Sequence, residues 1–184
     1  MSNQRGFTLA ELLVAGAFFM TVTGVGMALL GSALPSVRTD GEVNRLIGIL
    51  QLARETAITR QRDVEVRIDP DDNSVLVVRH EEDEEVPVRQ LIFEYNVSFV
   101  QFAGMGDSPD GYGAASAVDF GEAESMIFAP DGSFLAEDNV PLNGTFFLGV
   151  AGRPETARAL TVTGATARPR LYAWAADGAG WMAR

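Results

Sequence analysis

The 184-residue sequence contains no cysteine and a single histidine. Without cysteine, the protein can form no disulfide, no zinc–thiolate site and no thiol nucleophile. With one histidine, several of the usual acid–base and nucleophile arrangements are also absent. The sequence contains no phosphate loop, nucleophile elbow or dinucleotide fingerprint. Acidic residues are plentiful, so a catalytic pair of carboxylates is not excluded, but no spacing in the sequence identifies such a pair. We therefore expect a protein that is not an enzyme.

Positive charge is scarce, because 14 basic residues face 25 acidic ones and the formal net charge is −11. Such a chain is a poor non-specific partner for nucleic acid or anionic lipid. The charge is unevenly spread: residues 12–34 carry none, while residues 69–85 are rich in acids. The two segments therefore predict different environments.

The uncharged segment 12–34 is too long for an ordinary secretory signal, which has a shorter apolar stretch and a cleavage site after it. About 23 residues at ~1.5 Å each span roughly 35 Å, enough to cross a bilayer as a helix. Arg5 precedes it, so the positive-inside rule places the N-terminus in the cytoplasm. Glu11 lies at the start of this apolar run, where an unpaired carboxylate costs about 2.5 kcal/mol or more in hydrocarbon. Glu11 either stays hydrated near the headgroups or has a partner.

The residues around Glu11 resemble the class III leader of type IV prepilins and type II secretion pseudopilins. The matching residues are Arg5-Gly6-Phe7-Thr8-Leu9-x-Glu11-Leu12. The resemblance implies that a prepilin peptidase cuts between Gly6 and Phe7 and methylates the new amine of Phe7. It also implies that Glu11 pairs with the Phe7 amine of a neighbouring subunit. Two charges that are each costly in lipid offset one another only when two subunits dock in register.

After Pro35 the sequence predicts that the helix continues outside the membrane and packs one face on a β-domain. The positions at helical spacing are Val43, Leu46, Ile47, Leu50, Ala53, Ala57 and Ile58. We expect a cleaved leader at 1–6, a transmembrane assembly helix at 7–34, the periplasmic half of the spine at 35–62 and a β-rich head at 63–184.

From residue 64 the apolar period changes from helical to alternating. The predicted strands cover 64–68, 75–78, 91–102, 125–128, 145–150, 158–162 and 169–174, with a glycine-rich loop at 104–117 and a turn at 130–132. One long helix followed only by strands predicts an α+β fold, a helical spine packed on an antiparallel β-sheet head.

This order of elements resembles the GspH/FimT family of minor pilins and pseudopilins. The segments that carry the resemblance are 51–58, 127–132, 159–163 and 167–171. Two functions follow from it. The first is a minor pseudopilin of a type II secretion pseudopilus in the bacterial inner membrane, a structural subunit in protein export with a periplasmic head. The alternative is a FimT-like minor pilin that binds DNA in natural transformation. The implied partners are other pilins or pseudopilins, the prepilin peptidase and the inner-membrane assembly platform.

The DNA alternative depends on Arg168 and Arg170, which stand where FimT-type proteins carry a G-R-x-R motif. Arginines two apart on a strand share one face and could contact successive phosphates. Ala167 replaces the glycine of that motif, and the net charge opposes DNA binding. The competing interpretation is that these arginines pair with acidic loops of the head.

We expect no resident cofactor or metal, with calcium in the head as the one exception to consider. Asp69, Asp71 and Asn73 have the spacing of the first three ligands of a calcium-binding loop. However, Ser74 stands where that loop needs Gly, and His80 stands where it needs Glu. A hairpin turn is therefore favoured. The acidic run 80–85 is interpreted as a solvated loop. Asp107 and Asp110 in the glycine-rich loop are the remaining calcium candidates.

Overall fold

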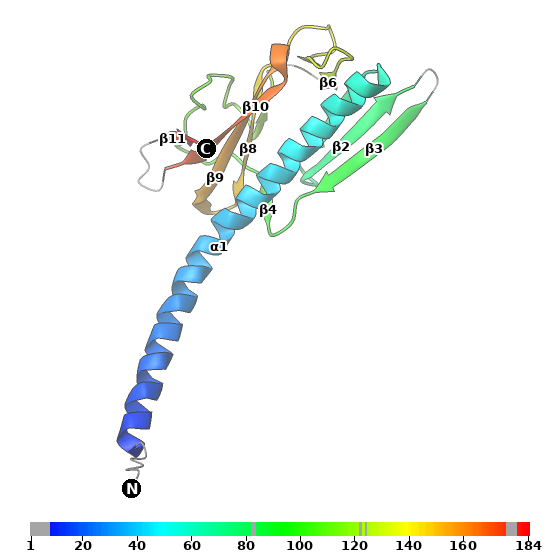
Figure 1. The fold of residues 1–184 in the computed structure, drawn as a ribbon. Helices are drawn as coiled ribbons and strands as arrows, with labels where there is room; N and C mark the ends of the chain where they lie inside the picture. The colour runs from blue at the N-terminus through cyan, green and yellow to red at the C-terminus, as the bar shows by residue number, and fades with distance from the viewer. Residues whose placement is uncertain (1–7, 82–83, 122, 124, 176–179) are drawn as a thin grey trace. The chain divides into compact units, whose positions relative to one another are not determined.

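The computed structural model describes residues 8–81, 84–121, 123, 125–175 and 180–184 (Figure 1). The chain divides into two compact units, the first ending at Pro35 and the second covering Ser36–Arg184. A single helix, α1 (Leu9–Arg60), supplies the described part of the first unit and the start of the second. The predicted helical spine is therefore confirmed as one continuous helix, with Pro35 inside it.

The second half of α1 buries the face that its apolar spacing predicts. Val43, Leu46, Leu50, Ala53 and Ala57 are all buried in the core of the second unit. Two expected positions differ, because Ile58 is 40% exposed and Ile47 only half-buried, while Ile49, which was not expected, is buried. The helix ends at Arg60, two residues before the predicted boundary, and Gln61 follows it in the left-handed region with φ 52°.

The strands form two antiparallel sheets. The first has the order β3-β2-β1-β6-β7, and the second has the order β11-β10-β9-β8-β4 with β5 also paired to β8. Their bounds are β1 (Val64–Asp69), β2 (Ser74–His80), β3 (Glu85–Ile92), β4 (Val97–Phe99), β5 (Val118–Asp119), β6 (Ile127–Phe128), β7 (Phe134–Leu135), β8 (Gly144–Val150), β9 (Arg153–Thr163), β10 (Arg168–Trp174) and β11 (Trp181–Ala183). A short 3-10 helix, η1 (Gly164–Thr166), joins β9 to β10. The α+β class and the antiparallel head are confirmed.

The two sheets and the second half of α1 share one core, and phenylalanine rings cross it from sheet to sheet. Phe146 on β8 lies 6.2 Å from Phe99 on β4 and 4.7 Å from Phe120. Phe120 is 5.8 Å from Phe134 on β7, which is 4.7 Å from Phe128 on β6. Such ring pairs stabilise by about 0.5–1.5 kcal/mol each beyond the area they bury. These contacts join the sheets into a single head.

The structure corrects several strand predictions. The strand expected at 91–102 is interrupted between β3 and β4, because Tyr95 and Asn96 adopt left-handed φ angles of 57° and 60° and turn the chain. The loop expected at 80–85 is shorter, since His80 ends β2 and Glu85 begins β3. The short strands β5, β7 and β11 were not predicted, because two or three residues carry too little alternation to detect.

Candidate functional site

The predicted cleavage site, Gly6–Phe7, lies outside the described residues, but the residues that follow it form a defined helix start. The Thr8 hydroxyl accepts a hydrogen bond from the Glu11 backbone N–H at 3.2 Å. The Glu11 carboxylate accepts from the Thr8 backbone N–H at 2.9 Å and from the Thr8 hydroxyl at 3.0 Å. This reciprocal arrangement is a capping box, with Thr8 as the N-cap and Glu11 at the third helical position. The T-x-x-E spacing in the sequence carries this signal.

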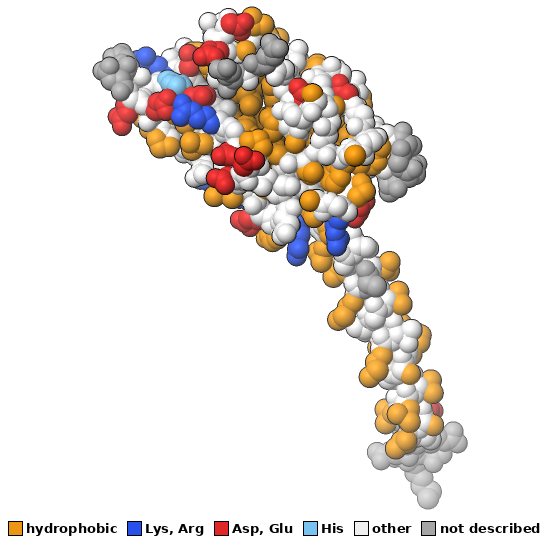
Figure 2. Space-filling model, turned by 180° about the vertical axis from the view of Figure 1, so that it is seen from behind, with side chains coloured by type: hydrophobic (Ala, Val, Ile, Leu, Met, Phe, Trp, Pro, Cys, Tyr) orange, Lys and Arg blue, Asp and Glu red, His pale blue; other side chains and the backbone are white. Residues whose placement is uncertain are grey.

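The apolar side chains of the first unit are exposed along the helix, as the hydrophobic surface in Figure 2 shows. Leu12, Phe18 and Phe19 are each more than 60% exposed. By length and composition, α1 contains a segment that could cross a membrane. A surface this apolar needs lipid or other helices to cover it, and Glu11 is the acidic group at its start.

The acidic stretch at 69–73 forms a hairpin turn between β1 and β2, as predicted. The Asp69 carboxylate accepts hydrogen bonds from the backbone N–H groups of Asp71 and Asp72, at 3.0 and 3.1 Å. Asn73 has a left-handed φ of 49°, and its side-chain oxygen accepts from the Phe99 N–H at 3.0 Å. These oxygens therefore serve the turn and its attachment to β4.

The glycine-rich loop is attached to the second sheet through Asp110. Its carboxylate accepts from the Thr161 hydroxyl at 2.6 Å, the Tyr172 hydroxyl at 3.0 Å and the Arg170 guanidinium at 2.7 Å. Asp107, the other calcium candidate, instead accepts from backbone N–H groups of its own loop, at Ser108 and Gly113. The two carboxylates thus do not share partners.

Asp110 links the stability of the head to pH. Burial opposes its ionisation, but the hydrogen bonds from Thr161, Tyr172 and Arg170 outweigh burial and hold its pKa below the usual value of 3.8. A lowered pKa means that the stabilisation is complete above the unfolded-state pKa and is lost as pH falls through the folded-state pKa.

We therefore expect Asp110→Asn to lower the melting temperature at pH 7 and to change it little at pH 2. Thermal unfolding of the full chain in detergent at both pH values measures this. A variant that is equally destabilised at pH 2 would show that Asp110 acts through shape and not through its charge.

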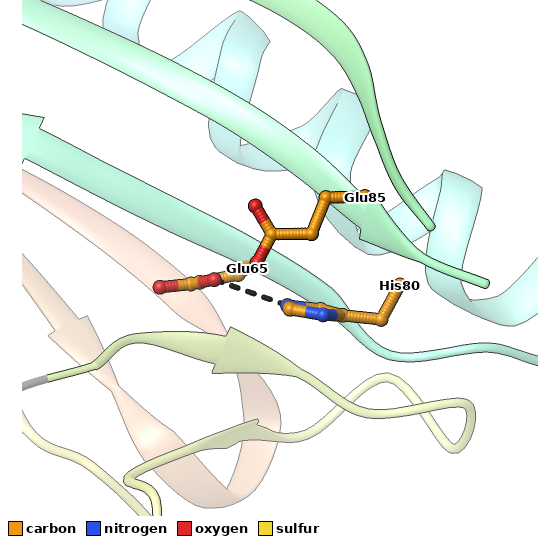
Figure 3. A group of neighbouring side chains, drawn as sticks. All are labelled: Glu65, His80 and Glu85. Atoms are coloured by element: carbon orange, nitrogen blue, oxygen red, sulfur yellow. Dashed lines mark hydrogen bonds and ion pairs between the residues drawn. The ribbon is translucent and has the colours of Figure 1, made fainter. Parts of the chain in front are cut away.

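Glu65, His80 and Glu85 come together across three strands of the first sheet (Figure 3). The Glu65 carboxylate lies 3.0 Å from His80 Nε2, and one ligand atom from each residue lies within 4.8 Å of the others. These residues could hold a metal by position. However, the Arg67 guanidinium donates to both Glu65 and Glu85 at 2.7 Å, so a cation would have to displace it. The arrangement is an ion-pair network. It was not predicted from the sequence, because His80 and Glu85 were placed in a solvated loop at 80–85.

The two arginines proposed for DNA contact have different surroundings. Both are exposed on β10. Arg170 forms an ion pair with Asp110 at 2.7 Å, which agrees with the competing interpretation that an acidic loop neutralises it. Arg168 lines a groove between α1 and the β9–β10 connection.

Two family models match the chain. Residues 1–15 match the prokaryotic N-terminal methylation motif, and residues 42–167 match the type II transport protein GspH. The second match covers most of the head described above and the part of α1 packed on it.

Individual proteins are also similar to this chain. Type II secretion system protein H of Pseudomonas aeruginosa is 32% identical over 76 residues, which cover 41% of this chain and 44% of that protein. The match thus spans less than half the length of that relative. Two solved structures of the minor pseudopilin EpsH from the type 2 secretion system of Vibrio cholerae are also similar. One is 17% identical with a TM-score of 0.45, covering 76% of this chain and 96% of that one. The other is 13% identical with a TM-score of 0.37, covering 81% and 92%.

Proposed function

The chain belongs to the type II transport protein GspH family, and on that premise we propose that it is a minor pseudopilin of a type II secretion pseudopilus. In this role it works by assembly and not by catalysis. The single observation that carries the proposal is the methylation motif at residues 1–15, which overlaps the start of an exposed apolar helix. An exported head with that start is suited to join a filament through its helix.

The proposed topology follows from the charge and length of the helix. The leader, 1–6, stays in the cytoplasm, where a prepilin peptidase removes it and methylates Phe7. The apolar segment crosses the inner membrane, and the head lies in the periplasm. The assembly platform and other pseudopilins are the proposed partners, with the apolar face of α1 as the surface that they cover.

DNA binding is the less favoured function. Of its two proposed contacts, Arg170 already pairs with Asp110. A second phosphate contact would have to break that pair, and the net charge of −11 would oppose the approach of DNA. Type II secretion system protein H of Pseudomonas aeruginosa, to which this chain is similar, is a secretion protein by its name, which supports the first function.

Complementation tests the proposal. The chain is expressed in its host after deletion of its own gene, and secretion of exported proteins into the medium is measured. We expect secretion to return, and mass spectrometry of the purified chain to show an N-terminus at Phe7 with one added methyl group.

Two results would contradict the proposal. An N-terminus still at Met1 in the active strain would exclude processing by the peptidase. Normal secretion in the deletion strain, together with a loss of DNA uptake, would favour the pilus function instead.

A further inference from the structure

A groove of about 470 Å³ lies between the second half of α1 and the connection from β9 to β10. Figure 1 shows the cyan part of α1 running beside the orange β10 at this point. The groove lies entirely in the second unit and is lined by Leu50, Gln51, Arg54, Phe128, Val162, Thr166, Ala167, Arg168 and Pro169. Its lining therefore combines apolar side chains with two arginines.

The charge of this lining is opposite to that of the whole protein. The chain carries a net charge of −11, yet the groove lining contains two guanidinium groups and no carboxylate. Elsewhere in this head, arginines such as Arg67, Arg79 and Arg170 each form an ion pair with an acidic side chain at 2.7 Å. Within the described residues, Arg54 and Arg168 form no such pair.

Arg54 is held in place by the turn that follows β6. Its Nε donates to the Gly132 carbonyl at 3.0 Å. A Cβ at Gly132 would lie 3.1 Å from that Nε and 2.8 Å from Ile58 Cδ1, and the φ of Gly132 is 84°. The turn therefore needs glycine in order to approach α1 this closely. Because the hydrogen bond to Gly132 uses the Nε of Arg54, the other nitrogens of that guanidinium can donate to another acceptor.

The opposite wall of the groove is also fixed. A Cβ at Gly164 would lie 2.3 Å from the Leu142 backbone nitrogen, so only glycine fits there. The Gly164 N–H donates to the Asn143 side chain at 2.8 Å, and Ala167 closes the connection with a left-handed φ of 49°. Arg168 follows directly, so a fixed backbone presents it at the groove.

The floor of the groove is apolar. Leu50, Phe128 and Val162 line it and are each no more than 3% exposed. Beside it, β10 pairs with β9 and, from Tyr172 to Trp174, with β11, and Pro169 has no N–H to donate to a further strand. Recognition here must therefore use side chains, with an apolar group on the floor and an anion between the arginines.

From this arrangement we propose that the groove binds an acidic segment of a neighbouring pilin-type subunit, with a carboxylate held by Arg54 and Arg168 and an adjacent apolar side chain on the floor. Guanidinium groups suit carboxylates because they donate two parallel hydrogen bonds. The inference rests on the proposed function in that it takes the partner to be another filament subunit.

A peptide-binding measurement on the full chain in detergent micelles tests the proposal. The probe is a fluorescein-labelled peptide that alternates Asp or Glu with Leu, and the comparison peptide has Lys at each acidic position. We expect the acidic peptide to bind, the Lys peptide not to bind, and added salt to weaken the complex. Arg168→Gln and Arg54→Gln should each raise the dissociation constant about threefold to tenfold, because each removes one charge-assisted contact.

Matched variants separate charge from folding. Arg89→Gln removes an exposed arginine from β3, outside this groove, and should bind as the wild type does. Arg54→Lys retains the charge and should lose less affinity than Arg54→Gln. The double variant Arg54→Glu/Arg168→Glu should prefer the Lys peptide, a reversal that misfolding cannot produce.

Equal binding of both peptides, or unchanged binding by Arg54→Gln/Arg168→Gln, would overturn the proposal. Displacement of the peptide by duplex DNA, with the same dependence on Arg168, would assign the groove to nucleic acid instead. The groove variants should still be cleaved and methylated at Phe7. A chain that is processed and restores secretion but binds no acidic peptide would therefore refute this inference while leaving the proposed function intact.

Discussion

Glu11→Gln is expected to abolish incorporation of the chain into pseudopili, while membrane insertion and cleavage before Phe7 continue. A glutamine can still accept the hydrogen bonds from Thr8 that complete the capping box, at 2.9 and 3.0 Å in the wild type. It cannot form an ion pair with the Phe7 amine of a neighbouring subunit. The substitution therefore removes the proposed charge pair and retains the local helix start.

Thr8→Ala is the matched control, because it removes the cap and keeps the carboxylate. Loss of an N-cap typically costs about 1 kcal/mol, so incorporation should fall only modestly. Glu11→Leu removes both interactions and should behave like Glu11→Gln. If Glu11→Gln assembles normally while Thr8→Ala fails, the role of Glu11 is to start the helix and not to register subunits.

Incorporation is measured by co-purification with sheared pseudopili, and the pairing itself by a zero-length carbodiimide cross-link. The sequence contains no lysine, so the N-terminal amine is the only aliphatic amine that this chain offers to a partner's carboxylate. A cross-link from that amine to the glutamate of a neighbouring subunit should form in assembled material and disappear after solubilisation.

Asp40→Ala is expected to destabilise the head by about 3–5 kcal/mol, because it leaves a buried arginine without its counter-ion. Arg158 on β9 is 2% exposed, and its Nε donates to the Asp40 carboxylate on α1 at 2.6 Å. Its other hydrogen bonds to described residues go to backbone carbonyls, at 3.0 Å for Ala157 and 3.4 Å for Glu155. At about 2–4 °C per kcal/mol for a domain of this size, the melting temperature should fall by roughly 6–20 °C.

Two further variants show whether the buried charge is the cause. Arg184 also binds Asp40, at 3.0 Å, but is 54% exposed, so Arg184→Ala should cost under about 1 kcal/mol. Asp40→Ala/Arg158→Met should recover much of the loss, since an apolar side chain can replace a buried charge at little cost. Thermal unfolding of the full chain in detergent measures all three. A double variant no more stable than Asp40→Ala would contradict the explanation.

The local sequence was enough to predict the character of the N-terminal region. The residues from Arg5 to Leu12 predict processing and assembly, and the uncharged run after them predicts a spanning helix, because both signals lie within a few consecutive residues. The buried face of α1 from Val43 to Ala57 was predicted for the same reason, since helical spacing needs no distant contact. The hairpin at Asp69–Asn73 followed from the chemistry of its turn residues.

The tertiary structure decided what distant residues do for one another. Asp110 and Asp107 look alike in the sequence, but only Asp110 meets Thr161, Arg170 and Tyr172. Arg168 and Arg170 look like a pair, but the fold neutralises Arg170 and presents Arg168 at a groove with Arg54. No local pattern encodes these differences, because strand register and sheet packing set them over separations of 50 residues or more. The sequence alone thus predicted a helix that spans the membrane and assembles into a filament, whereas the fold decided which charges of the head pair with one another.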